Sequence, residues 1–115
     1  MSTKRIAREK SLSFAVRIVH LYQYLCREHS EFILSKQVLR SGTSIGANLT
    51  EAIYGSSKKD FVAKLRIALR ECAETLYWLE LLHTCNYLPS ALYRSLSQVC
   101  EELRRILIAS IKASG

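Results

Sequence analysis

Apolar side chains recur every three or four residues along nearly the whole chain, and this period constrains the fold more than any other feature. The clearest case is the segment from about Pro89 to Ala113, where the apolar spacings are four, three, four and three. Its members are Leu92, Leu96, Val99, Leu103 and Ile106. This repeat is the heptad seam found in antiparallel helical bundles. The chain has only four glycines and one proline, so long helices with short connections are favoured over many short strands.

The same period predicts three more helices before this one. They run from about Thr3 to Glu28, from Phe32 to Gly55 and from Lys58 to Asn86. Gly55 can end one helix, and Ser57 or Asp60 can begin the next. Pro89 suits the first turn of the last helix. Because short connections make successive helices antiparallel, we expect an all-α fold: an up-down antiparallel four-helix bundle, with residues 1–115 as a single domain.

The third helix carries more apolar surface than one core face requires. Its segment LYWLELL (Leu76–Leu82) is apolar on more than half of its circumference, whereas a core-facing stripe is a little over ~100° wide. The last helix adds three apolar residues beside its seam: Leu107, Ile108 and Ile111. Because an additional apolar stripe usually binds another subunit, Tyr77, Trp78 and Leu81 are predicted to form a homo-oligomer interface. The alternative is that the two aromatic rings only cover the bundle ends.

The net charge of +7 makes anionic partners the first candidates: nucleic acid, an acidic protein or an anionic membrane surface. The charge is uneven, because the segment Met1–Arg40 carries five of the seven net positive charges. The alternative is a helix surface whose solvated charges happen to be mostly basic. Charge alone therefore indicates a class of partner and no dedicated site.

The cysteine pattern and the N-terminus indicate a reducing compartment. No two cysteines are spaced as CxxC, and none lies at metal-finger spacing from a histidine pair. The sequence MSTKRIAREK is not a secretory signal, and no run of about 18 apolar residues occurs that could span a membrane. We therefore expect a cytoplasmic protein with no membrane partner, no metal, no cofactor and no small-molecule substrate.

The segment SGTSIGANLTEA (Ser41–Ala52) interrupts the apolar pattern with small and polar residues. Gly42 and Gly46 lie four residues apart, so they stack on one face of the second helix. Two glycines in a helix interior cost roughly 2 kcal/mol relative to alanine. We expect the close approach of a neighbouring helix to offset this cost.

Polar residues follow a second edge of the same segment. Ser44, Asn48 and Glu51 are spaced by four and three residues, so they share this edge. The third helix offers its own polar residues as partners: Arg70, Glu71 and Glu74. A hydroxyl, an amide and a carboxylate can satisfy one another and fix the register between two helices.

A helix-turn-helix is the rival interpretation of this segment. VLRSGTSIGANLTEA could form a helix, a turn at Gly42 and a recognition helix that presents Asn48 and Thr50 to bases. However, that helix would contain Glu51 and no basic residue from Thr43 to Ser57. Phosphate contacts dominate the affinity of DNA-binding helices, so this composition speaks against the rival interpretation.

A catalytic interpretation has less support. Ser44, Glu51 and His83 do not have the spacing of a known triad, and the segment GTSIG is not a nucleophile elbow. No pair of helices carries the Glu-x-x-His motif of two-metal bundles. No catalytic residue is therefore predicted.

Two motifs give the chain a family resemblance that covers essentially its whole length. QVLRSGTSIGANLTEA (Gln37–Ala52) and FVAKLRIALRECAETLYWLELL (Phe61–Leu82) resemble the four-helix-bundle proteins encoded in 23S ribosomal RNA intervening sequences. The chain is also similar to the accessory variability determinant of diversity-generating retroelements, a ring-forming basic bundle that works with a reverse transcriptase and RNA. The resemblance implies a homo-oligomer, with a pentamer favoured, and contact with nucleic acid. It implies no reaction.

The resemblance also assigns individual positions. The signature polar positions of the family match Ser44, Asn48, Glu51, Glu71 and Glu74, which we interpret as structural. Gly42 departs from the family pattern, in which alanine is more usual.

Two groups of residues are predicted to contact RNA or DNA. One is a stripe on the outer face of the first helix: Arg17, His20, Tyr24 and Arg27. The other is a basic cluster at its start: Lys4, Arg5, Arg8 and Lys10. Basic side chains bind phosphates and an exposed tyrosine can stack on a base. The predicted function is therefore non-enzymatic nucleic-acid binding by a homo-oligomer. The alternative function is a protein-binding adaptor that uses the apolar face of the third helix.

Overall fold

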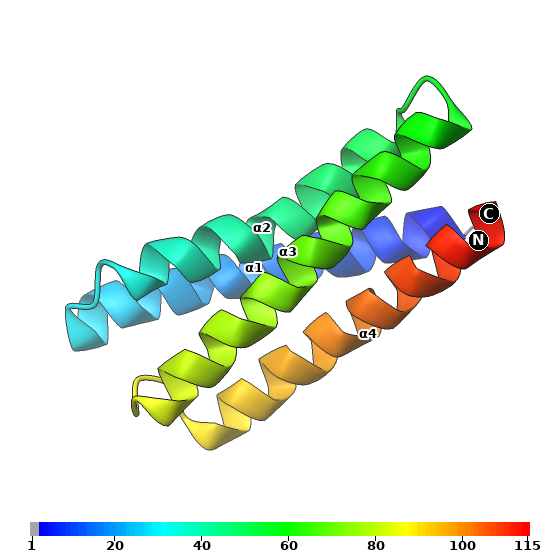
Figure 1. Cartoon of the computed structure of the whole chain (residues 1–115). Coiled ribbons are helices and arrows are strands. Elements are labelled where there is room, and N and C mark those ends of the chain that lie inside the picture. Colours follow the sequence, from blue (N-terminus) through cyan, green and yellow to red (C-terminus); the bar gives the residue numbers. More distant parts are fainter. Residues whose placement is uncertain (1–2) are drawn as a thin grey trace.

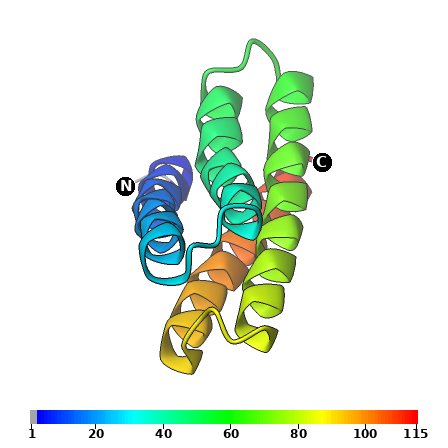
Figure 2. The ribbon, with the colours of Figure 1, turned by 90° about the vertical axis from the view of Figure 1, so that its left-hand side faces the viewer.

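Residues 3–115, which the computed structural model describes, form four α-helices (Figure 1). They are α1 (Thr3–His29), α2 (Leu34–Ile53), α3 (Lys58–Thr84) and α4 (Ser90–Ser114). Each helix packs against the next and α4 packs against α1, so α1 and α3 lie diagonally across the bundle, as do α2 and α4 (Figure 2). The predicted all-α, up-down four-helix bundle is confirmed. None of the helices in this part of the chain is long and apolar enough to cross a membrane.

The core is one apolar cluster to which all four helices contribute. In α4 its fully buried residues are Leu96, Cys100, Leu103 and Leu107, whereas the other members of the predicted seam lie half-buried at the edge of the core. A four-helix core takes a wider stripe than a two-helix seam, which explains the difference. Leu107 was expected beside the seam, so part of the apparent excess of apolar surface on α4 belongs to the core.

The helix ends follow from local hydrogen bonds. The Ser57 side chain accepts a hydrogen bond from the Asp60 N–H at 3.1 Å, which confirms Ser57 as the N-cap of α3. The start of α2 has no such cap at Ile33. Instead, the Glu31 carboxylate accepts the backbone N–H groups of the first residues of the helix at 2.8–2.9 Å. Glu31 therefore satisfies donors that would otherwise lack a partner at the helix N-terminus.

Glu31 gives the fold a predictable response to acid. Its partial burial alone would raise the pKa of the carboxyl, but the three backbone hydrogen bonds outweigh burial and lower it. A lowered folded-state pKa contributes stability above the unfolded value near pH 4.3, and this contribution is lost as the pH falls through the folded value. Glu31→Gln should therefore lower the free energy of unfolding by about 1 kcal/mol at neutral pH. Thermal melts across this range check it: the difference from the parent should vanish in acid, and a pH-independent difference would contradict the prediction.

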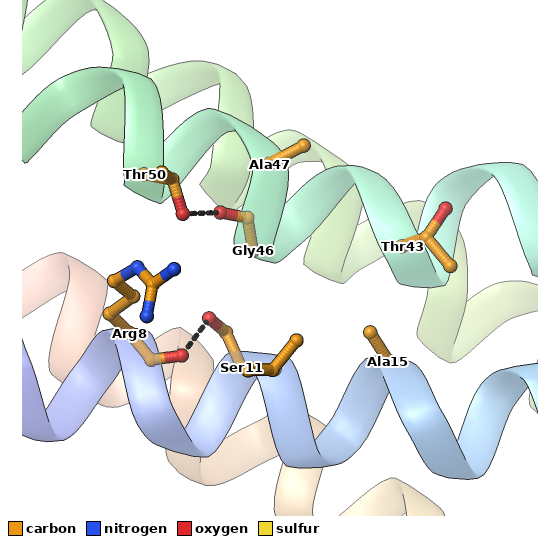
Figure 3. A pocket seen from close by; sticks show the side chains of 8 residues that line it. Arg8, Ser11, Ala15, Thr43, Gly46, Ala47 and Thr50 are labelled. Atoms are coloured by element: carbon orange, nitrogen blue, oxygen red, sulfur yellow. Dashed lines mark hydrogen bonds between the residues drawn. The ribbon is translucent and has the colours of Figure 1, made fainter.

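Gly42 and Gly46 lie inside the continuous helix α2, so the helix-turn-helix alternative is wrong. The two glycines allow α2 to pack closely against α1. A Cβ added at Gly42 would lie 2.8 and 2.9 Å from two carbons of the buried Ile18 side chain. At Gly46 an added Cβ would lie 3.0 Å from the Ser11 hydroxyl, which faces Gly46 across the helix contact (Figure 3). The predicted close crossing is confirmed, with α1 as the neighbour.

These two glycines should respond differently to alanine. Alanine raises helix propensity by about 1 kcal/mol at either position, but overpacking a core usually costs about 1–3 kcal/mol. At Gly42 the obstacle is a buried branched side chain, so Gly42→Ala should lower the melting temperature. At Gly46 the obstacle is one serine hydroxyl, so Gly46→Ala should be close to neutral. Ile18→Ala removes both of these γ carbons, so it should cost less stability in the Gly42→Ala background than in the parent, and equal costs would rule out the clash as the cause.

Candidate nucleic-acid interface

The signature polar residues lie along the edge between α2 and α3, but they do not bond to one another as expected. The Ser44 hydroxyl donates to the Arg40 carbonyl at 2.6 Å, and the Asn48 amide donates to the Ser44 carbonyl at 2.9 Å. Both bonds are internal to α2. Glu51 instead pairs with Lys64 of α3 at 3.1 Å. The expected mutual pairing is therefore wrong for these three residues.

The link between the two helices joins the predicted Glu71 and Glu74 to a residue that the sequence analysis did not select. The Arg40 guanidinium pairs with Glu71 at 3.3 Å and also with Glu74. Below this pair, the buried Thr75 hydroxyl donates to the Ser41 hydroxyl at 3.0 Å. These contacts occupy the carboxylates of the edge with basic residues of the same chain. The edge is thus a helix–helix contact, in agreement with its structural interpretation.

The predicted stripe on α1 is only partly free. Arg17 donates to the Ser95 hydroxyl of α4 at 2.8 Å, and Arg27 pairs with Glu28 at 3.1 Å. The Tyr24 hydroxyl lies 3.3 Å from the His29 ring nitrogen. His20 is exposed. Arg17, His20 and Tyr24 line a cleft with Leu92 of α4, so this part of the stripe faces the side of α1 that adjoins α4 and its predicted place on the outer face is wrong.

The second predicted cluster is divided by ion pairs. Arg5 pairs with its neighbour Glu9 at 3.2 Å. Lys10 pairs with Glu102 of α4 at 2.5 Å, and the hydrogen bond and charge of Lys10 lower the pKa of that carboxyl. Lys4 and Arg8 have no carboxylate partner within residues 3–115. The Arg8 side chain instead reaches from α1 toward α2 (Figure 3).

The antiparallel packing adds three lysines to Lys4 and Arg8 at one end of the bundle. The start of α1, the turn from α2 to α3 and the end of α4 meet at this end (Figure 1). We call the resulting surface the basic end, and its residues are Lys4, Arg8, Lys58, Lys59 and Lys112. Lys4 and Lys58 line one cleft with Phe61, and the Lys4 ammonium lies 4.7 Å from the centre of the Phe61 ring. None of these five cations has a carboxylate partner in the described part of the chain.

Three of these cations lie where helix electrostatics disfavours them. Lys4 lies in the first turn of α1, and Lys58 and Lys59 begin α3. The N-terminus of a helix carries a partial positive charge, so a cation in the first turn costs typically 0.3–1 kcal/mol. The first turn of α1 contains no acidic residue, whereas the first turn of α3 contains Asp60. These three cations do not stabilise the helices on which they lie. Together with the helix N-termini they favour the binding of an anion.

Two apolar patches lie on the diagonal helices. The α3 patch consists of the predicted interface residues Tyr77, Trp78 and Leu81, of which Tyr77 is 58% exposed and the other two are half-buried. The α1 patch was missed by the sequence analysis and consists of Leu12, Val16 and Val19, which are 55%, 48% and 37% exposed. Their spacing of four and three on a second face of α1 was the available signal. The α1 patch borders the groove of Figure 3, because Leu12 lines that groove together with Ala15 and Ala47.

Residues 3–115 contain no cluster of three or more histidine, cysteine or acidic side chains that could hold a metal ion. Ser44 is bonded to its own helix, and the His83 ring bonds with the Ser90 hydroxyl at 3.1 Å. All four cysteines are free thiols, with Cys72 and Cys100 buried in the core.

The helix order and the distribution of charge define a class of protein: a basic up-down four-helix bundle. The chain belongs to the family described as 23S rRNA-intervening sequence protein, which matches residues 3–109. It is also similar to a crystal structure of a protein with unknown function from the S23 ribosomal protein family of Bacteroides thetaiotaomicron. The two share 50% sequence identity with a TM-score of 0.95, over 96% of this chain and 99% of that one. A comparison with curated proteins gives no match.

Proposed function

We propose that this chain is a non-enzymatic, cytoplasmic RNA-binding protein that works as an assembly of identical subunits. The observation that carries the proposal is the basic end, where five cations without carboxylate partners in residues 3–115 lie at the end of the bundle at which α3 begins. RNA is the first candidate because the family description refers to 23S ribosomal RNA. DNA is the second candidate, since phosphates are common to both.

Assembly of several subunits would increase the number of weak contacts with one RNA strand. The α1 and α3 patches lie on diagonally opposed helices, so one patch of a subunit can pack on the other patch of its neighbour. Such a head-to-tail interface generates a ring when the rotation closes. A pentamer is favoured by the resemblance to ring-forming bundles. Each ring would present one basic end per subunit, and linked weak sites increase the overall affinity for one strand.

A fluorescence anisotropy titration tests the proposed binding. Labelled single- and double-stranded RNA and DNA of mixed sequence would be titrated with the protein between about 50 and 200 mM salt. We expect binding that weakens steeply with salt, because each phosphate contact adds about 0.7–0.9 to the slope of log affinity against log salt. Absence of binding at the lower salt concentration would reject the proposal.

The α3 patch supports a second candidate function, a protein-binding adaptor. Tyr77 is largely exposed, and the Trp78 indole N–H beneath it is buried without a hydrogen-bond partner in the described residues. A different protein could cover the exposed Tyr77 ring. A chain that neither binds nucleic acid nor assembles with itself would favour the adaptor.

A further inference from the structure

A cleft between α1 and α4 lies away from the basic end. It has a volume of about 300 Å³, and its lining residues are Arg17, His20, Leu21, Tyr24 and Leu92. α1 and α4 make the sparsest contact of the four neighbouring helix pairs, which leaves room for the cleft. Its base is apolar, because Leu21 is buried and Leu92 is half-buried. Its rim is cationic or aromatic and includes no carboxylate.

We propose that this cleft binds a single unpaired nucleobase of single-stranded RNA, stacked against Tyr24 beside Arg17. This inference rests on the proposed RNA-binding function and adds the form of RNA that is bound. An RNA base that has left its stack is recognised by aromatic rings and by arginine guanidinium planes. A base within a duplex cannot enter such a cleft, so the cleft selects single strands.

The side chains on the rim are held in place by their neighbours. The Arg17 guanidinium donates to the Ser95 hydroxyl at 2.8 Å, which fixes it at the wall formed with α4. The Tyr24 and His29 rings meet edge to face with centroids 5.4 Å apart, and His29 meets Tyr87 in the same way at 5.3 Å. Such pairs restrict the orientation of the rings. A preorganised aromatic wall loses less entropy when a base stacks on it.

His20 completes the rim as an exposed side chain without a hydrogen-bond or ring partner in the described residues. Its ring nitrogens are free to bond with the edge of a base or with a phosphate. From Lys4 to His20 the rise of α1 is about 24 Å, at 1.5 Å per residue. One strand can therefore place phosphates on the basic end and a base in the cleft.

Nuclear magnetic resonance with mononucleotides tests the cleft without the basic end. Adenosine monophosphate is the probe, and ribose phosphate is its matched control because it lacks only the base. We expect adenosine monophosphate to shift the ring signals of His20 and Tyr24, and ribose phosphate to leave them in place. Equal shifts with both compounds, or no shift with either, would overturn the inference even if the protein binds RNA.

Variants of Tyr24 extend the test from mononucleotides to RNA. Loss of one stacked base usually lowers affinity by about tenfold or more. Tyr24→Leu should show this loss for single-stranded RNA and little change for duplex RNA. Tyr24→Phe keeps the ring and should bind single strands like the parent, and it also serves as the folding control. Unchanged single-strand affinity in a folded Tyr24→Leu would overturn the inference, whereas equal failure of the parent with every nucleic acid would reject the proposed function itself.

Discussion

If the proposed homo-oligomer forms, Leu12→Glu is expected to reduce it to single chains of 13.1 kDa. Leu12 is 55% exposed, so a glutamate there is solvated in the isolated subunit and should not disturb its core. In a subunit interface the same carboxylate would be desolvated against an apolar surface, which is strongly unfavourable. Light scattering at micromolar concentration measures the mass directly. Gln98→Glu is the control, because it adds the same charge at an exposed position of α4, which carries neither patch.

Tyr77→Glu should dissociate the assembly from the opposite side. The structure favours this position over Trp78, because the indole packs against the core and its replacement would damage the fold as well. Parent protein that is already a single chain, or two charged variants that both remain assembled, would show that these patches are not the interface.

Mixing the two variants separates a ring interface from a symmetric one. The Leu12→Glu chain keeps an intact α3 patch, and the Tyr77→Glu chain keeps an intact α1 patch. If α1 packs on α3 of the neighbour, the mixture should form one-to-one pairs of twice the single-chain mass and stop there. If each patch packs on its own copy, the mixture should form no such mixed pair. Native mass spectrometry with one isotope-labelled chain distinguishes the two results.

Apolar periodicity predicted the helices well because the residues that are buried in a bundle recur with the period of the helix. The bounds of α1 to α4 lie within two residues of those expected, and Ser57 caps α3 as its side chain suggested. The start of α2 was placed two residues early, because Glu31 caps it from outside the helix. No period in the sequence reports such a contact.

The polar edge of α2 shows that residue spacing does not determine which hydrogen bonds a polar side chain makes. Ser44 and Asn48 were correctly placed on one edge, but short polar side chains can reach a backbone carbonyl four residues earlier as easily as a neighbouring helix. Which of the two occurs depends on the distance between the helices. Arg40 and Lys64 have the length to cross that distance, and they form the ion pairs. Spacing alone cannot rank these possibilities.

The basic end could have been predicted from the sequence, but the sequence analysis did not identify it. Lys4, Lys58 and Lys112 are far apart along the chain, and only the antiparallel order of the helices brings them to the same end. That order was already predicted from the short connections. A search of each bundle end, in addition to each helix face, would have grouped them. Lys10 could not have been set aside in this way, because its ion pair with Glu102 depends on the packing of α1 against α4. Arg5 could have been set aside, because Glu9 follows it at the i,i+4 spacing of a helical ion pair.

Replacing Lys58 and Lys59 by glutamine should weaken RNA binding and at the same time stabilise the bundle. Both lysines begin α3, where removal of a cation is worth typically 0.3–1 kcal/mol each at low salt. For a chain of this size, 1 kcal/mol corresponds to a rise of roughly 4 °C in melting temperature. The affinity for RNA should fall for all sequences, and the salt slope should become shallower by about 0.7–0.9 for each phosphate that the variant no longer binds. Thermal melts and anisotropy titrations of the same preparation measure both changes.

Lys36→Gln is the matched control for this experiment. Lys36 lies in the first turn of α2, at the opposite end of the bundle, and it is exposed without a carboxylate partner in residues 3–115. The Lys36→Gln variant should therefore leave RNA affinity unchanged. Its gain in stability should be smaller than that of the Lys58 and Lys59 replacements, because the Glu31 carboxylate already lies at the N-terminus of α2. A stabilised Lys58→Gln, Lys59→Gln protein with unaltered affinity would exclude the basic end as the RNA-binding surface. Lower stability of this variant would instead show that the two lysines make stabilising contacts within the fold. That result would contradict the expected unfavourable interaction of the lysines with the N-terminus of α3.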